Sequence, residues 1–539
     1  MESHYASIWE AIADVVPDAE ALVQGRLRRT WADFENRAAR LAGAFAAAGL
    51  GAGSKVGLYL YNSPEFMESY FAALKIRAIP FNVNYRYVDE ELLYLLDNAD
   101  AHALVFHSGF SHTVDRIIPR LPKLKLVVSV DEGGDQPDHA ERYEDLVALS
   151  EPAPRQSRGR DDVTMIYTGG TTGMPKGVIS NIAATVDDLM HTTPGMIGEA
   201  PASSPQDAVD LAVRFAAEGR QFVTIPAPPL IHNTALGIAA NPTLLFGGRL
   251  ALLNGRRFDV NELWDVAEAE KANCIVVVGD AFARPMRKAL DDDPSRDLSS
   301  VSLIASSGAM FSTEVKTGLL EHLPQAFIAD IIAATEGSMG LAISSRGHPI
   351  PTGSFTPWPG VIVVAEDGRV IAPGSDEVGM VALPGGAQGY FKDSEKTAAT
   401  FRDINGVRHT IPGDFATIGV DGKLTLLGRG SQCINSAGEK IFPEEVEEVL
   451  KLHPAVEDAL VFGLPDERFG QRVVAVVSLR PGADPVSEED IVASARTRLA
   501  SYKLPRQIVV VAETPRTATG KADYPTAREL FGAAVGNAE

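Results

Sequence analysis

The residues best suited to chemistry in this sequence lie in one stretch, 167–177, which reads Tyr-Thr-Gly-Gly-Thr-Thr-Gly-Met-Pro-Lys-Gly. Its glycines let backbone N–H groups approach an anion closely, and its threonine hydroxyls add hydrogen-bond donors. A lysine adds a mobile positive charge. A surface turn explains glycine and threonine, but it does not explain so many donors around one lysine. The stretch therefore predicts a polyphosphate site. Its donors are Thr168, Gly169, Gly170, Thr171, Thr172 and Lys176.

The common nucleotide-binding loop has a different pattern. That loop ends in Gly-Lys-Ser or Gly-Lys-Thr, and its hydroxyl binds Mg²⁺. Here Lys176 follows Pro175 and precedes Gly177. The sequence therefore disfavours a P-loop ATPase or kinase.

Three other charged residues are candidates. Glu336 follows Thr335 after an apolar run and offers the hard carboxylate that Mg²⁺ on ATP needs. Asp414 precedes a strand, where a carboxylate can accept hydrogen bonds from both ribose hydroxyls, although an exposed turn aspartate fits the same pattern. Lys521 follows Thr-Gly near the chain end, where a lysine considered alone is usually solvated.

The elements that must position these residues alternate along the chain. Apolar periodicity predicts helices at 30–50, 64–75 and 88–98, and strands at 56–61, 78–82 and 102–107. A hairpin is predicted at 416–427, and a small α+β unit follows it. Repeated β–α alternation is typical of parallel sheets covered by helices, so the predicted fold class is α/β.

Composition narrows the function classes. The 539 residues are 45% hydrophobic and carry a net charge of −22, which favours two or more globular domains. The chain shows no long basic run, no apolar run near eighteen residues and no basic-then-apolar leader at its start, so nucleic acid, a membrane span and secretion are not expected. The two cysteines, Cys274 and Cys433, fit a reducing cytosol.

The 167–177 stretch closely resembles the phosphate loop of the adenylate-forming superfamily, which contains acyl-CoA synthetases, peptide-synthetase adenylation domains and beetle luciferases. Later segments resemble further motifs of that superfamily in the expected order, and the likeness covers roughly residues 30–530. These segments are Thr335-Glu336-Gly337, Pro412-Gly413-Asp414, Gly428-Arg429 and Thr519-Gly520-Lys521.

The resemblance implies a role for each matching residue. Catalytic roles fall to Lys521, Glu336, Thr168 and His232, with Glu336 as the Mg²⁺ ligand. His232 lies in an apolar turn, and lining the acyl pocket is favoured for it over acid–base chemistry. The implied acyl-binding residues are His232, Asn233 and Ala309. Besides the phosphate loop and Lys521, the implied ATP-binding residues are Ser307, Gly308, Ala309, Ile332, Ala333, Ala334, Thr335, Glu336, Asp414 and Arg429.

Five positions depart from the superfamily pattern, and one of them is Ala333, which stands where a glycine is usual. Ile332 stands where an aromatic residue usually stacks on adenine, and it offers only an apolar face. Pro412 lacks the hydroxyl and N–H of the usual threonine. Gln432 and Asn435 replace an aspartate and a lysine near the domain hinge, beside residues that keep it flexible.

The resemblance implies an ATP-dependent acyl-CoA synthetase. A large α/β domain, 1–429, is expected to hold ATP and the acid, and a small α+β domain, 430–539, to supply Lys521. The implied cofactors are ATP and Mg²⁺, with coenzyme A as co-substrate. The expected location is the cytoplasm, and a homodimer is one possible assembly. A bulky hydrophobic acid, long-chain or sterol-derived, is expected because Ile332 replaces the larger aromatic residue and the turn around His232 is apolar.

Two other functions stay open at this point. One is an adenylating enzyme that loads the thiol of a carrier protein, for which no carrier domain follows in this chain; a luciferase-like oxidative step is a weaker variant. The other is a nucleotide-binding regulator without turnover, against which the retained Lys521 and Glu336 argue.

Overall fold

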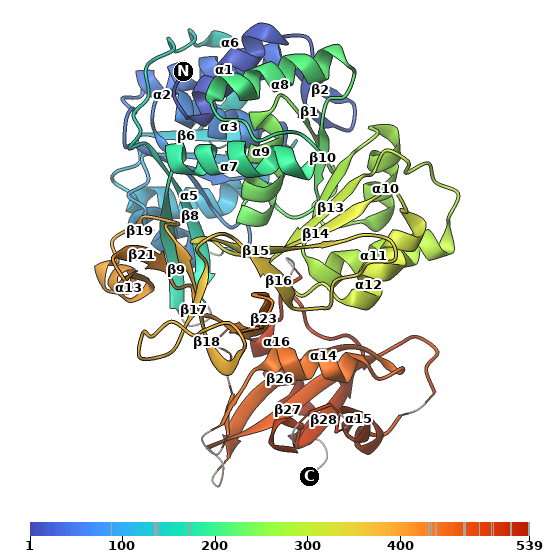
Figure 1. Ribbon diagram of the computed structural model, residues 1–539. Coiled ribbons are helices and arrows are strands. Elements are labelled where there is room, and N and C mark those ends of the chain that lie inside the picture. Colours follow the sequence, from blue (N-terminus) through green and yellow to red (C-terminus); the bar gives the residue numbers. More distant parts are fainter. Residues whose placement is uncertain are drawn as a thin grey trace.

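The structure is a computed structural model. It describes the chain except residues 88, 134–136, 138, 171–172, 430–431, 433, 437–438, 467–469, 485, 497, 500, 518–519 and 537–539. A large body contains the first four-fifths of the chain, and a smaller body below it contains the remainder (Figure 1). No described helix is both long and apolar enough to cross a membrane.

One sheet of the large body has eight strands in the order β19-β9-β8-β4-β3-β5-β6-β7. Strands β8, β4, β3, β5, β6 and β7 run parallel, and β9 folds back antiparallel on β8. The bounds are β3 Lys55–Tyr59, β4 Ile79–Asn82, β5 Ala103–His107, β6 Leu126–Val130, β7 Glu141–Arg142, β8 Val163–Gly170, β9 Gly173–Asn181 and β19 Gly389–Tyr390.

A second sheet has β2 at one edge, antiparallel to β1. The parallel strands β1, β11, β10, β12, β13 and β14 follow in that order, and the sheet continues through antiparallel strands into a β-rich region. Its parallel strands are β1 Glu20–Gln24, β10 Val223–Pro226, β11 Arg249–Leu252, β12 Cys274–Val277, β13 Leu303–Ser307 and β14 Phe327–Ala334. The antiparallel strands are β2 Leu27–Thr30, β15 Gly337–Ser344, β16 Ser354–Pro357, β17 Ile362–Val364, β18 Ser375–Pro384, β20 Phe401–Ile404, β21 Val407–Thr410, β22 Asp414–Ile418 and β23 Leu424–Arg429.

Helices cover both sheets, as the β–α alternation predicted. They are α1 Tyr5–Val15, α2 Trp31–Ala47, α3 Pro64–Lys75, α4 Asp89–Asn98, α5 Ser111–Ile117, α6 Tyr143–Leu149, α7 Ile182–Met196, α8 Pro205–Ala217, α9 Asn241–Leu245, α10 Val260–Ala269, α11 Gly279–Asp292, α12 Thr313–His322 and α13 Ser394–Thr400. Thr30 caps α2 in a reciprocal capping box with Asp33. The α/β fold class is therefore confirmed.

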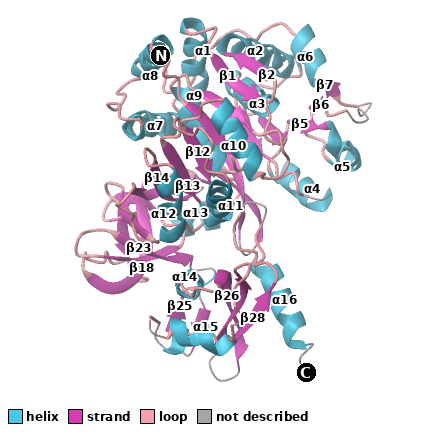
Figure 2. Cartoon of the chain, turned by 90° about the vertical axis from the view of Figure 1, so that its right-hand side faces the viewer, coloured by secondary structure: helices cyan, strands magenta, loops and turns pink. Residues whose placement is uncertain are grey.

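The small body is an α+β unit. Its sheet has the order β25-β24-β27-β26, and β28 runs parallel beside β27. Figure 2 shows its helices around this sheet and its separation from the large body. The bounds are β24 Ile434–Ser436, β25 Glu439–Ile441, α14 Pro443–Lys451, β26 Val456–Asp466, β27 Gly470–Leu479, α15 Glu488–Ala495, β28 Gln507–Val511 and α16 Tyr524–Gly536.

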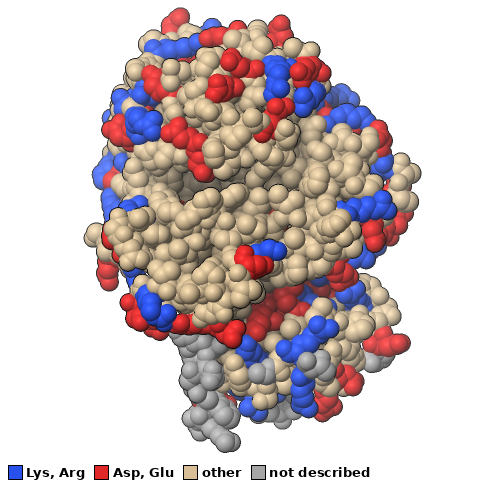
Figure 3. Space-filling model, viewed as in Figure 1, with Lys and Arg blue, Asp and Glu red and all other residues tan. Residues whose placement is uncertain are grey.

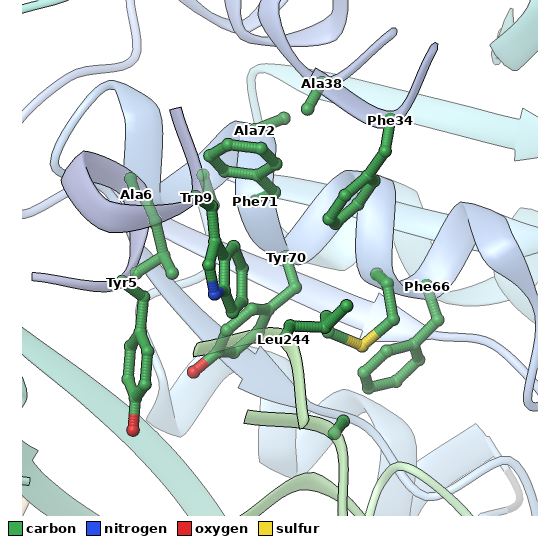
Figure 4. Packing of buried hydrophobic residues seen from close by; sticks show 14 of the residues in the cluster. Tyr5, Ala6, Trp9, Phe34, Ala38, Phe66, Tyr70, Phe71, Ala72 and Leu244 are labelled. Carbon is green, nitrogen blue, oxygen red and sulfur yellow. The ribbon is translucent and has the colours of Figure 1, made fainter. Parts of the chain in front are cut away.

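The main core of the large body joins the two sheets. Trp9 is fully buried and meets the ring of Phe71 edge-on, with 5.2 Å between the ring centroids. Phe34 and Tyr70 lie beside it (Figure 4). The same cluster contains buried residues of β1, β3, β5 and β11, which come from both sheets. The helices between the sheets therefore bind them into one body.

A buried ion network accompanies this core. The ammonium of Lys75 lies 2.8 Å from Glu10 and 2.6 Å from Glu35, and only 2% of its side chain is exposed. Arg158 donates two further hydrogen bonds to Glu10, at 2.8 and 2.9 Å. The network ties α1, α2 and α3 to the segment that leads into β8.

Lys75→Met is expected to destabilise the large body by about 3 kcal/mol, because it leaves part of the buried carboxylate pair without its cation. Urea unfolding followed by tryptophan fluorescence measures the shift. Arg120→Met is the control, since its ion pair with Glu90 is exposed on both sides. Equal midpoints for the two variants would contradict a stabilising role for the Lys75 network.

Candidate functional site

The described part of the phosphate stretch belongs to the paired strands of a β-hairpin. Strand β8 continues through Thr168 to Gly170, and β9 begins at Gly173, with Thr168 opposite Lys176. The backbone stays extended here because β9 pairs with it up to the turn. Thr171 and Thr172, two of the predicted donors, lie outside the described residues.

Lys176 already contacts an anionic group. Its Nζ lies 2.5 Å from Oδ2 of Asp393, the residue that caps α13. The pair is partly exposed, 41% for Lys176 and 25% for Asp393. A phosphate oxygen could take the place of the Asp393 carboxylate oxygen beside Lys176. The arrangement therefore suits an anion near the hairpin. Asp393 lies 217 positions from Lys176 and was not predicted as its partner.

Asn82 ties the hairpin to the turn that carries His232. Its amide donates hydrogen bonds to the backbone oxygens of Tyr167 at 2.9 Å and Ile231 at 2.7 Å, and its Oδ1 accepts from Tyr167 N–H at 2.7 Å. The side chain is buried. Tyr167 precedes Thr168 and Ile231 precedes His232, so this one amide fixes the spacing of two predicted site segments. The sequence interpretation had assigned no positioning role to Asn82.

Glu336 lies in the tight turn between β14 and β15. Its carboxylate is buried and accepts a hydrogen bond from the hydroxyl of Tyr390, on β19 of the other sheet. Its backbone oxygen accepts from Ala387 N–H at 2.8 Å. These contacts hold the carboxylate close to the end of the sheet that carries the phosphate hairpin. Tyr390 was not among the predicted residues.

The described residues contain no group of three or more His, Cys, Asp or Glu side chains arranged to hold a metal. Mg²⁺ is usually held by one or two carboxylates together with substrate phosphates and water, and not by a cage of protein ligands. A single buried carboxylate at Glu336 fits that mode of binding. Glu336 therefore stays the predicted Mg²⁺ ligand for a bound polyphosphate.

The segments predicted to surround adenine come from adjacent strands. Ser307 ends β13 and is buried, and Gly308 has a φ of +92°, a conformation that favours glycine. Ile332 and Ala334 lie on neighbouring β14 and pack into the apolar cluster of the β-rich region. Only 5% of Ile332 is exposed, so it offers a ligand little more than an apolar edge.

Asp414 and Arg429 face each other across the hairpin of β22 and β23. The Asp414 side chain is buried, with 7% exposed, and is not the exposed turn residue of the alternative interpretation. For Arg429 the structure describes the backbone, which pairs with that of Asp414, and not the side chain. The hairpin itself agrees with the sequence prediction.

Lys521 of the small body reaches the large body at Gly308. A methyl group at Gly308 would lie 3.8 Å from Cε of Lys521 and 3.5 Å from Oγ1 of Thr234. His232 lies close enough for the charge of Lys521 to affect it. Burial, followed by the charges of Lys521 and Arg86, lowers the pKa of His232 to about 4. The imidazole is therefore neutral at pH 7, which favours pocket lining.

The structure thus brings three of the predicted residues together at the junction of the two bodies: His232, Gly308 and Lys521. It places Lys176 and Glu336 in separate contacts, with Asp393 and Tyr390. Figure 3 shows Asp and Glu side chains gathered along the junction. A polyanion entering there needs local cations, since the chain as a whole carries a net charge of −22.

Comparison with known proteins gives consistent matches over the whole chain. The model of the AMP-binding enzyme family matches residues 9–391, and that of the AMP-binding enzyme C-terminal domain matches residues 445–521. A 3-oxocholest-4-en-26-oate–CoA ligase from Rhodococcus rhodochrous is 41% identical over 99% of this chain and 96% of its own. A medium/long-chain-fatty-acid–CoA/3-oxocholest-4-en-26-oate–CoA ligase from Mycobacterium marinum is 40% identical over 97% and 96%.

A solved structure supports the fold. An anthranilate CoA ligase in complex with anthranoyl-AMP superimposes with a TM-score of 0.83, at 24% identity, over 99% of this chain and 100% of that one. At this level of identity the likeness concerns the fold alone.

Glu336→Gln is expected to raise the Mg²⁺ concentration needed for half-maximal ATP turnover by about tenfold or more, because a neutral amide is a poor ligand for a hard dication. The measurement is a Mg²⁺ titration of pyrophosphate release. Glu377→Gln is the control, since Glu377 is exposed and contacts Arg369. A wild-type titration curve for Glu336→Gln would remove this residue from the metal site.

Proposed function

This chain belongs to the AMP-binding enzyme family, and we propose that it is an ATP-dependent acyl-CoA synthetase for a bulky hydrophobic acid. The carboxylate of the acid attacks the α-phosphorus of ATP and releases pyrophosphate, which leaves acyl-AMP. The thiol of coenzyme A then attacks the acyl carbon, and AMP leaves with the electron pair of the broken C–O bond.

The residues of this chain mainly align charges in the first step. Thr168, Lys176 and the backbone of the hairpin would hold the β- and γ-phosphates, and Asp414 and Arg429 would hold the ribose. Glu336 would hold Mg²⁺, which neutralises charge on the phosphates when it is bound. Lys521 would lie between the acid carboxylate and the α-phosphate.

The observation that carries this proposal is the place of Lys521. The residue belongs to the small body, yet its side chain lies beside Gly308 and affects His232 in the large body. A lysine delivered in this way suits the adenylation step. We place the boundary between the two domains at 429/430, and we infer that rotation about this hinge withdraws Lys521 and opens a path for the thiol of coenzyme A.

The contacts across the junction support a movable domain. Arg480 contacts Glu314 at 3.2 Å and Arg284 lies 3.9 Å from Glu457, and all four side chains are partly exposed. Exposed ion pairs contribute little and exchange readily with water. The ring of Phe442 contacts that of Phe415 at 5.4 Å next to the proposed boundary.

A large apolar acid suits the large body. Small buried residues of β12, β13 and β14 form an apolar cluster with the π-helical segment η3, Thr234–Ala240, which follows His232. Figure 3 shows a hollow in the large body whose visible walls carry few charged side chains. Relatives named for a sterol-derived acid and for medium- and long-chain fatty acids support the same substrate class.

Two alternatives differ in the acceptor or in turnover. An enzyme that loads a carrier-protein thiol would make acyl-AMP but transfer it to a phosphopantetheinyl carrier and not to coenzyme A. A regulator would bind ATP without releasing pyrophosphate. Incubation with ATP, an acid panel and either acceptor separates the three. A cytoplasmic location and a homodimer remain predictions.

Lys521→Ala is expected to slow acyl-AMP formation by about 10²–10⁴-fold, since it removes a positioned charge from that step. Thioester formation from synthetic acyl-AMP should change far less, because the small domain has then moved. Pyrophosphate exchange and thioester release measure the two steps separately. Lys503→Ala is the control, since Lys503 contacts Glu445 within the small domain. Equal loss in both steps would rule out the two-position role of Lys521.

The acid preference is tested by kcat/KM for acetate, hexanoate, palmitate, a cinnamate and a sterol-side-chain acid. Palmitate or the sterol acid is expected to exceed acetate by several decades, because each buried CH₂ contributes about 0.8 kcal/mol. Ala309→Trp should reduce activity on the large acids selectively. A preference for acetate or the cinnamate would overturn the substrate class and leave the reaction class in place.

A further inference from the structure

The loop that carries Lys521 is closed by its own hydrogen bonds. Thr517 N–H donates to the backbone oxygen of Lys521 at 2.7 Å, and Gly520 N–H donates to the oxygen of Thr517 at 2.8 Å. Lys521 N–H donates to Thr517 Oγ1 at 3.2 Å. Arg516 and Ala522 form a β-bridge at the neck of the loop. Lys521 therefore moves with Arg516 as one unit.

Arg516 fastens this loop to the sheet of the small domain. Its Nε and Nη2 donate to the two carboxylate oxygens of Asp458, on β26, at 2.9 and 2.7 Å. About a quarter of each side chain is exposed, 27% and 21%. Two parallel hydrogen bonds between planar groups fix orientation as well as distance, which a lysine could not do.

A second contact holds the other flank of the loop. Tyr524, three residues after Lys521, donates a hydrogen bond from its hydroxyl to Glu447 of α14 at 3.1 Å. Glu447 also accepts from Val461 N–H at 2.9 Å, and Val461 lies on β26 as Asp458 does. Both flanks of the loop are therefore held against β26, one directly through Asp458 and the other through Glu447.

The loop meets the large domain with little clearance. Gly520 has a φ of +76°, and a methyl group there would lie 2.5 Å from Cβ of Ala281 on α11. Glu457, next to Asp458, faces Arg284 of the same helix at 3.9 Å. Tilting the loop about its neck would therefore move Lys521 relative to Gly308. A displacement of 1 Å at a reacting group can cost about 10²-fold in rate.

We propose that Arg516, through its paired hydrogen bonds to Asp458, is a positioning residue that holds Lys521 in place for acyl-AMP formation and is not needed for thioester formation. The proposal rests on the acyl-CoA synthetase function proposed above. The guanidinium of Arg516 is bound to Asp458 within the small domain, so Arg516 acts on Lys521 through the loop.

Arg516→Met tests this assignment. We expect the kcat of ATP–pyrophosphate exchange to fall by about 10–100-fold, because the loop loses its fixed orientation. The KM for ATP and the rate of thioester formation from synthetic acyl-AMP should stay within about threefold of the wild-type values, since Arg516 is not proposed to bind ATP or acyl-AMP. Arg516→Lys and Asp458→Asn should give the same division between the two steps, and they keep the test available if Arg516→Met does not fold.

Arg528→Met is the matched control. Arg528 lies in the same domain, donates to the oxygen of Gly463 at 2.6 Å and stacks on Phe462 at 4.8 Å, but it does not contact the loop. Arg528→Met should lower the thermal midpoint of unfolding, and it should change pyrophosphate exchange and thioester formation to the same extent.

Four outcomes separate the ideas. Selective loss of exchange in all three test variants supports the role of Arg516. Equal loss in both half-reactions, or unchanged exchange, overturns it. Exchange by the wild type without thioester formation overturns the proposed acceptor and still allows Arg516 to be judged from exchange. Absence of exchange with any acid overturns both proposals.

Discussion

The charge of Lys521 can act in the large domain only while the small domain is docked on α11. Every other group of the candidate site belongs to the large body, and this one cation belongs to the small body. At the junction the loop around Gly520 lies against Ala281, ion pairs join Arg480 to Glu314 and Arg284 to Glu457, and the ring of Phe442 packs near that of Phe415.

Local signals in the sequence were sufficient for much of the fold. Thr30 and Ser63 each cap a helix that periodicity predicted, and β22 pairs with β23 in the predicted hairpin. These features depend on residues a few positions apart, where capping and turn chemistry act directly. The parallel direction of the strands could also be predicted, since a strand–helix–strand unit has few ways to pack.

The partners of the site residues could not be predicted in this way. Asp393 meets Lys176 across 217 positions, and Tyr390 meets Glu336 across 54. Asn82 connects Tyr167 and Ile231 through backbone atoms, for which side-chain identity gives no signal. No strand was predicted within 167–177, and pairing with β9 decides the extended backbone there. In each case a long-range contact outweighs the local preference.

The difference between fixed and movable parts follows from solvent exposure. Within the large body, the cations of Lys75 and Arg158 are almost fully enclosed with Glu10, and separating them would leave a buried charge unpaired. At the junction, Arg480 and Glu314 keep a third or more of their side chains in water. Parting them costs little, because each charge regains its hydration. The same types of side chain are therefore enclosed within the large body and partly hydrated at the junction, and the proposed movement of the small domain rests on this difference.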